Sequence, residues 1–329
     1  MQNFTEKRRQ QFLTETYYTR YKDYRNESIL LILESDAFEN DEYNCGENER
    51  WVFIQDMYHG LMYIEYTAGK AIEKLIPLLE KVIDAYEKQA EALATFKKTK
   101  KPSIITEIGE MLSIIGLAYL LDRRDLLPRI TTLINGENGG RLREDAITSR
   151  FLRFNDLNHS VIELGDEALY NPAYHTDWCK VIDHTNDEEN KKYAVQALDE
   201  YLSDWYQMNK HELWYNSHLD LENKFSYIGY WAFEAAALVY LLDLDDRSLH
   251  KYLYYPKDIV QWIRNKKPNQ IIKNESEQVR VAARESCPRS GYWFTVAQEN
   301  SRQYFKQGDI FPDFESDWGD VYWQFDGDK

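Results

Sequence analysis

The chain has 329 residues, of which 43% are hydrophobic, and its 56 acidic and 40 basic side chains give a formal net charge of −16. A chain of this length can bury a sizeable core without disulfides. Its acidity disfavours nucleic acid and anionic lipid as partners and favours a basic protein. Three widely spaced cysteines fit no zinc or redox motif. No stretch reaches ~18 uninterrupted apolar residues and the first residues lack the apolar core of a secretory signal, so we expect a soluble, cytoplasmic protein with no membrane segment.

Helical periodicity dominates most of the chain. Apolar residues three and four apart predict helices over residues 2–33, 49–68, 71–93, 103–121, 143–154, 158–168, 174–183 and 186–209, then within 227–246, and again from Pro256. Gly69 separates the second of these helices from the third. Pro77 either bends the third helix or marks its true beginning. Ser103 is the expected N-cap of the fourth.

Two interruptions suggest how the chain is divided. The glycine-rich stretch NGENGG at 135–140 breaks regular structure. Strand-like aromatic density, punctuated by glycine and proline, begins only after residue 285. We therefore expect an N-terminal helical region (1–135), a second helical region (136–265) and a tail packed on the helical body (266–329). The predicted fold class is all-α, an irregular multi-helix bundle with a short, non-helical, aromatic-rich C-terminal appendix.

The motifs of common catalytic and metal sites are missing. His175, Cys179 and His184 lie close together in sequence, but their spacing does not match a motif that places metal ligands on one helix face. NGENGG resembles neither a Walker A loop nor a dinucleotide-binding fingerprint. No nucleophile motif occurs. The sequence therefore predicts no catalytic residue, no metal site and no cofactor.

Paired carboxylates are the one enzymatic alternative that stays open. An all-helical, acidic chain rich in Trp and Tyr could be a helical-toroid glycoside hydrolase, in which two carboxylates flank an aromatic-lined sugar cleft. Glu234, Asp243, Asp245 and Asp246 would supply them. Such toroids usually have a longer chain and more helices than are predicted here.

A carboxylate within the apolar segment 227–246 needs an explanation. On a helix, Glu234 would share a face with Tyr230 and Trp231. Such a carboxylate must be paired, so we expect it to be buried and bonded to Tyr hydroxyls, a Trp indole or an Arg of another helix. Asp246 is placed to cap the short segment that follows. Asp243 and Asp245 gain nothing locally and are the first candidates for contact with a partner.

The same stretch carries a family resemblance. GYWAFEAAALVYLLDLDDRSL (229–249) followed by YYPKDIV (254–260) resembles the C-terminal half of PoNi immunity proteins. The matching positions are Gly229, Tyr230, Trp231, Phe233, Glu234, Ala235 to Ala237, Asp245, Asp246, Ser248, Leu249, Tyr255, Pro256 and Asp258. YIEYTAGKAIEKLIPLLE (63–80) is similar to the N-terminal region of that family. The tail from Cys287 is similar to a segment of other polymorphic-toxin immunity proteins, with Val296 where proline is usual.

The resemblance implies a non-enzymatic antidote to a PoNe-type DNase effector, which bacteria deliver to competitors by type VI and related secretion systems. An acidic protein of this kind would occlude the basic DNA-binding surface or active site of the toxin. The predicted partner-binding residues are the acids Asp243, Asp245 and Asp246 and the aromatic anchors Trp231, Tyr227 and Tyr255. Gly229 and Glu234 are predicted to be structural. The partner is a basic toxin rather than nucleic acid or a membrane, and a homodimer stays open.

Overall fold

The computed structural model describes residues 3–137, 146–156, 158–161, 178–179, 182–183, 188–266, 280–295, 298, 301–313 and 321–327. The chain divides into two compact units, Met1–Pro268 and Asn269–Lys329. The boundary expected near residue 135 stays a prediction. Most of the predicted helices 158–168 and 174–183, with His175 and His184, lie outside the described residues.

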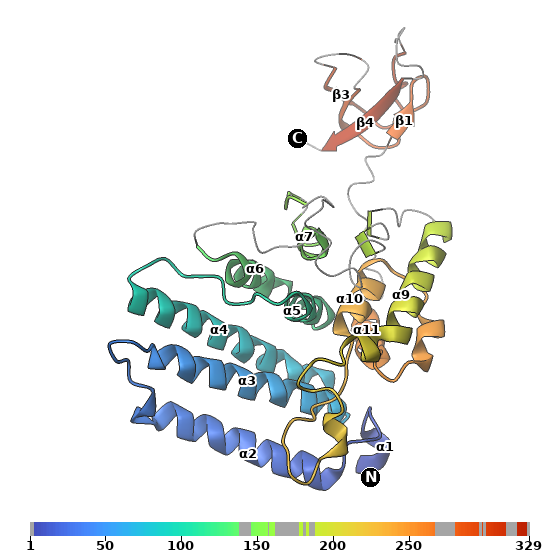
Figure 1. The fold of residues 1–329 in the computed structure, drawn as a ribbon. Coiled ribbons are helices and arrows are strands. Elements are labelled where there is room, and N and C mark those ends of the chain that lie inside the picture. Colours follow the sequence, from blue (N-terminus) through green and yellow to red (C-terminus); the bar gives the residue numbers. More distant parts are fainter. Residues whose placement is uncertain are drawn as a thin grey trace. The chain divides into compact units, whose positions relative to one another are not determined.

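The first unit is helical. Its helices follow one another along the chain as α1 (Phe4–Lys7), α2 (Glu15–Glu34), α3 (Gly46–Thr67), α4 (Ile76–Lys97), α5 (Ile108–Leu120), α6 (Leu127–Asn135), α7 (Ala146–Arg153), α9 (Glu188–Met208), α10 (Phe233–Leu241) and α11 (Lys257–Lys266). Figure 1 shows α2, α3 and α4 side by side. Helix α6 packs on α4, and α5 packs on α6, α7 and α10. The all-α prediction for this part is confirmed. None of the helices within the described ranges is long and apolar enough to cross a membrane.

Helix α5 is the centre of the core. Every residue from Ile114 to Leu120 is buried, because this helix is apolar on all sides and is covered by helices on several of them. Gly116 lets α10 approach closely, since a Cβ at this position would lie 3.1 Å from the Cβ of Ala237. The segment 227–246 is therefore anchored in the core through α10.

The helix boundaries show where sequence signals succeeded. Pro77 lies in the first turn of α4 and so marks its beginning, one of the two predicted alternatives. Gly69, two residues past the end of α3, has a φ of +73°. Glycine adopts this left-handed conformation readily, and it turns the chain away from the helix axis. Ser103 is not an N-cap, because α5 begins only at Ile108. The backbone before it instead donates from Ile104 and Ile105 to the carbonyl of Leu133 in α6.

The second unit is a small antiparallel sheet. Its strands are β1 (Arg280–Ala282), β2 (Gly291–Phe294), β3 (Gln303–Phe305) and β4 (Tyr322–Gly327), in the order β1-β4-β2-β3. Trp293, Phe311 and Trp323 form its core with Phe305, Val321 and Cys287. The aromatic residues that set the tail apart in sequence thus build a core of their own, and the prediction of a non-helical, aromatic-rich appendix is confirmed.

Candidate functional site

The predicted site residues begin in an extended segment, not in a helix. Gly229 has a φ of +108°, and a Cβ there would lie 2.1 Å from the Thr67 hydroxyl and 2.4 Å from the Trp231 indole nitrogen. Only glycine leaves room for Thr67 to accept from Trp231 Nε1 at 2.9 Å and donate to the carbonyl of Ile228 at 2.6 Å. Helix α10 therefore begins at Phe233. The expectation that Glu234 shares a helix face with Tyr230 and Trp231 was wrong, since this tertiary contact holds the backbone extended.

Glu234 lies in the first turn of α10 and is buried. Its Oε1 accepts from Tyr201 Oη at 2.8 Å and from Trp205 Nε1 at 3.0 Å, both on α9. Burial raises the pKa of this carboxyl above its ordinary value, and these hydrogen bonds only partly offset the effect. The donors are of the kinds that the sequence predicted. Glu234 therefore joins α9 to α10 in the interior and presents no open face to a substrate.

The predicted aromatic anchors are core residues. Tyr227, Trp231 and Tyr255 are all buried. The hydroxyl of Tyr227 donates to Oε1 of Gln10 at 2.8 Å, and Gln10 itself donates to the carbonyl of Tyr230 at 2.6 Å. Their predicted role as anchors for a partner requires exposed rings, and these rings are not exposed. Tyr227 and Trp231 instead bond to Gln10 and Thr67, and Tyr255 bonds to Asp246.

Asp246 is also inside. Its carboxylate accepts from Tyr255 Oη at 2.7 Å and from Arg264 Nη1 at 2.8 Å, and His250 Nε2 lies 3.3 Å away. Burial would raise the pKa of Asp246, but the hydrogen bonds from Tyr255 and Arg264 outweigh it and hold the pKa below its ordinary value. Asp246 is the N-cap residue of the 3-10 helix Arg247–Lys251, as the sequence predicted, but its side chain makes no capping hydrogen bond there. It joins that turn to α11.

Asp243 and Asp245 are the only two predicted acids on the surface. Asp243 is exposed and has a φ of +50° just past the end of α10. Asp245 is exposed too, but both its oxygens accept from Arg247 Nε, at 2.8 and 3.0 Å. That guanidinium holds the pKa of Asp245 at about 2. Asp243 and Asp245 are thus open to a partner, although Asp245 already has a cation.

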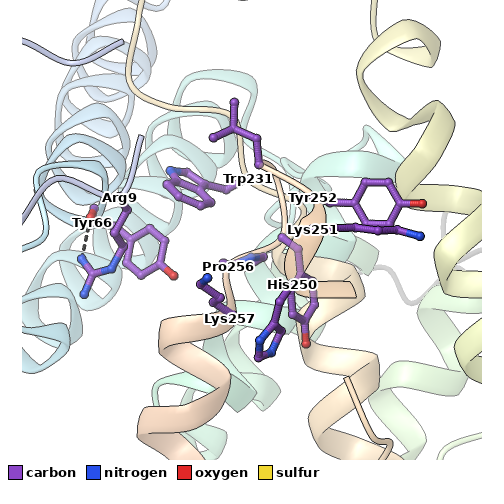
Figure 2. Close-up of a pocket in the computed structure, with 10 residues that line it drawn as sticks. Arg9, Tyr66, Trp231, His250, Lys251, Tyr252, Pro256 and Lys257 are labelled. Carbon is purple, nitrogen blue, oxygen red and sulfur yellow. Dashed lines mark hydrogen bonds between the residues drawn. The ribbon is translucent and has the colours of Figure 1, made fainter. Parts of the chain in front are cut away.

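A pocket of about 260 Å³ is lined by two of the predicted anchors, Trp231 and Tyr255. Figure 2 shows the residues that surround it, which are Arg9, Tyr66, Trp231, His250, Lys251, Tyr252, Pro256 and Lys257, with Leu253 and Tyr255 completing the lining. Its basic groups are mostly neutralised within the chain. Arg9 pairs with Asp258 at 2.8 Å, and Lys251 pairs with Asp199 at 2.7 Å. The pocket is smaller than a usual small-molecule site and is largely balanced in charge.

The described residues bring together no metal site. Across the described ranges, no three His, Cys, Asp or Glu side chains gather where they could hold an ion. Cys179, the one member of the His-Cys-His group that is described, is buried. For a glycoside hydrolase, the four candidate carboxylates are poorly arranged, since two of them, Glu234 and Asp246, are buried and already bonded.

One segment of the chain, which contains α7, α9, α10 and the first residues of α11, matches a known protein family. Residues 144–259 match the model of PoNe immunity proteins (PoNi), C-terminal. These residues are a PoNi C-terminal domain. Immunity proteins of this family are typically non-enzymatic, in keeping with the internal bonding of Glu234 and Asp246. The match ends before the C-terminal unit, so the similarity of the tail to other immunity proteins stays a prediction.

The fold has a relative of known structure. The chain is similar to the crystal structure of protein PA2201 from Pseudomonas aeruginosa, with a TM-score of 0.54 and 16% sequence identity. The similarity covers 79% of this chain and 91% of that one. At such low identity it shows the fold alone. No curated protein matches the chain.

Sequence reasoning missed a surface at the other end of the first unit. Exposed apolar side chains gather where α2 ends and α3 begins, among them Leu30, Leu31 and Phe53. The signal was present, because residues 29–33 are five consecutive apolar residues and a helix can turn only some of them toward a core.

Proposed function

We propose that this chain is the antidote to a PoNe-type DNase effector used in interbacterial competition, delivered by a type VI or related secretion system. It acts in the cytoplasm of the cell that makes it, by binding the toxin and occluding its DNA-binding surface or active site. The observation that carries the proposal is the PoNi C-terminal domain at residues 144–259.

The charge of the chain supports this mechanism. A nuclease that grips a polyanion presents a basic surface, and a partner with a formal net charge of −16 is attracted to it. Steering of this kind raises association rates toward about 10⁸ M⁻¹s⁻¹ at low salt. A fast encounter suits an antidote, which must intercept the toxin before DNA is cut. No turnover is needed for protection.

Asp243 and Asp245 belong to the proposed binding surface. They are exposed, and they follow the buried helix that carries the family pattern. Asp246, Tyr227, Trp231 and Tyr255 act indirectly, by holding this part of the domain in shape. Trp231 and Tyr255 are buried and line the pocket described above.

The experiment is a titration of DNA cleavage. The toxin encoded beside the gene for this chain is mixed with increasing amounts of the purified protein, and cleavage of linear DNA is followed. We expect cleavage to stop near a one-to-one ratio and an unrelated DNase to be unaffected. Uninhibited cleavage at excess protein would refute the proposal. Hydrolysis of a phosphoester or glycoside by the protein alone, abolished in Glu234→Gln, would replace it with an enzymatic function.

A further inference from the structure

An apolar and acidic surface lies at one end of the first unit, far along the chain from the PoNi domain. We call it the α2–α3 end and define it by six exposed apolar residues, Leu30, Leu31, Leu33, Tyr43, Val52 and Phe53. They come from the last turns of α2, the connection after it and the first turns of α3. Leu31 and Tyr43 are 69% and 81% exposed. Clustered apolar groups of this kind mark interaction surfaces more often than scattered ones do.

The charge around these residues has one sign. Residues 23–56 contain ten acidic side chains and two arginines. Six of the acids are exposed and make no ion pair or side-chain hydrogen bond within the described part of the chain: Glu27, Glu34, Asp36, Glu39, Glu42 and Glu49. Both arginines are turned inward, Arg25 to Asp56 and Arg50 to Glu47. The α2–α3 end therefore offers apolar contact within a field of uncompensated negative charge.

The surface has a firm support. Ile29, Ile54, Met57, Leu61 and Ala85 form a separate buried cluster beneath it. Arg50 donates from Nη1 to the carbonyls of Ile32 and Leu33, at 2.5 and 3.1 Å, and from Nη2 to that of Ser35 at 3.0 Å. The guanidinium thus satisfies the carbonyls that end α2 and ties them to α3. A partner that binds here loses little free energy to ordering of the backbone.

The charge of the α2–α3 end indicates which kind of partner can bind there. A second copy would bring the same unpaired acids against themselves. The C-terminal unit of this chain is acidic as well, with eleven acidic and seven basic residues from 269 to 329. A basic protein complements the surface, and an apolar contact ringed by charge is the usual make-up of a binding hot spot.

We infer that the α2–α3 end docks the basic toxin, with Leu30, Leu31 and Phe53 as apolar anchors and Glu34 and Glu42 as steering charges. This inference rests on the proposed function, and it places the main contact outside the residues that carry the family pattern. Apolar burial at the anchors sets how long the complex lasts, whereas the acids set how fast it forms.

The test compares matched surface variants in binding to the purified, catalytically inactivated toxin encoded beside the gene. The anchor variant carries Leu30→Ser, Leu31→Ser and Phe53→Ser. Its control carries Leu213→Ser and Leu219→Ser, at leucines that are 100% and 72% exposed elsewhere on the same unit. We expect the anchor variant to bind at least about 30-fold more weakly, mainly through faster dissociation, and the control to stay within about twofold of wild type. Equal melting temperatures establish that the fold is kept, and Leu31→Ser alone replaces the triple variant if they differ.

The possible outcomes separate the two proposals. If the wild-type protein does not bind the toxin, the proposed function fails. If wild type binds and inhibits but the anchor variant behaves like the control, the inference about the α2–α3 end fails and the proposed function stands. A wild-type dimer that the anchor variant converts to a monomer, with toxin affinity unchanged, would assign the surface to a second copy and also overturn the inference.

Discussion

The region around α10 and the α2–α3 end use similar residue types in opposite ways. Around α10, aromatic rings and carboxylates are buried and bonded to one another, as Glu234 is to Tyr201 and Trp205. At the α2–α3 end, aromatic and aliphatic side chains are exposed beside acids such as Glu34 that have no bonded partner in the described structure. The bonded groups around α10 hold one conformation of the fold. The exposed apolar and acidic groups of the α2–α3 end remain available to contact a partner. The residues that identify the family and the residues that contact a partner therefore need not be the same.

This difference between the two regions predicts different effects of substitution in each. Changes to the buried residues around α10 should alter the free energy of unfolding, and any loss of protection should follow from the loss of folded protein. Changes at the α2–α3 end should alter toxin binding at constant stability. A variant of the buried residues around α10 that keeps its stability but loses toxin affinity would move the main contact from the α2–α3 end into the PoNi domain.

The largest effect on stability is expected for Gly229→Ala. The added methyl group would meet Thr67 and the Trp231 indole at 2.1 and 2.4 Å, and alanine is strained at a φ of +108°. We expect the free energy of unfolding to fall by about 3–5 kcal/mol, from strain and overpacking together. Urea unfolding would measure it. Gly109→Ala is the control, because a Cβ there meets nothing within 4 Å. A loss for Gly229→Ala no larger than for this control would mean that the extended segment can rearrange freely.

Asp246→Ala is expected to have the next largest effect. It leaves the buried hydroxyl of Tyr255 and the guanidinium of Arg264 without their acceptor. Arg264 is partly exposed and can regain water, so we expect a loss of about 2–4 kcal/mol rather than the full penalty of a buried ion. Thermal unfolding would measure it, with Asp245→Ala as the control, since Asp245 and Arg247 are both exposed. Equal losses in the two variants would contradict the buried role of Asp246.

Gly229 and Asp246 show which parts of the site could be predicted from the sequence and which could not. Helices were predictable from periodicity, and the burial of Glu234 followed from the apolar residues around it. The start of α10 was not, because it depends on a contact between Gly229 and Thr67, 162 positions apart in the chain. The role of Asp246 depends in the same way on Arg264 of α11. Local patterns predict elements, whereas the partners of polar groups come from tertiary packing.

The prediction that Tyr227 and Trp231 contact a partner failed for a related reason. Tyr227 and Trp231 are residue types that are common on binding surfaces, and their side-chain hydrogen-bond partners lie outside the segment 227–246. The partners come from the N-terminal part of the chain, through Gln10, Tyr17 and Thr67. The PoNi domain is thus completed by residues that lie outside the family match. A long-range partner cannot be inferred from the segment alone.

A smaller loss is expected for Glu234→Ala. The hydroxyl of Tyr201 and the indole N–H of Trp205 would lose their shared acceptor. We expect a loss of about 1–3 kcal/mol, measured by urea unfolding. Glu234→Gln keeps an oxygen for both donors and is the matched control, with a smaller expected loss. If Glu234→Ala kept full stability and lost toxin binding, the carboxylate would be a contact residue and the structural role assigned to it would be wrong.

The two buried carboxyls should also respond to pH in opposite directions. The folded pKa of Glu234 lies above its ordinary value of 4.5, so the wild-type protein loses stability relative to Glu234→Gln as pH rises from 4.5 toward the folded pKa. The folded pKa of Asp246 lies below 3.8, so its contribution is present above 3.8 and is lost as pH falls toward the folded pKa. Unfolding of wild type, Glu234→Gln and Asp246→Asn across this range would show both trends. Parallel pH curves for the three proteins would contradict them.

The smallest effect is expected for Asp243→Lys combined with Asp245→Lys. Glu34→Lys combined with Glu42→Lys is the matched comparison, because both double reversals change the net charge by the same amount and a purely global field would make them equal. Asp245 is already neutralised by Arg247, whereas Glu34 and Glu42 have no ion pair within the described residues. We therefore expect the reversal after α10 to slow association at low salt by no more than about threefold, and the reversal at the α2–α3 end to slow it by about tenfold or more. Stopped-flow association rates at several salt concentrations would measure both, and the difference should shrink as salt screens the field. The opposite ranking would place Asp243 and Asp245 nearer the docked toxin and the α2–α3 end outside its path.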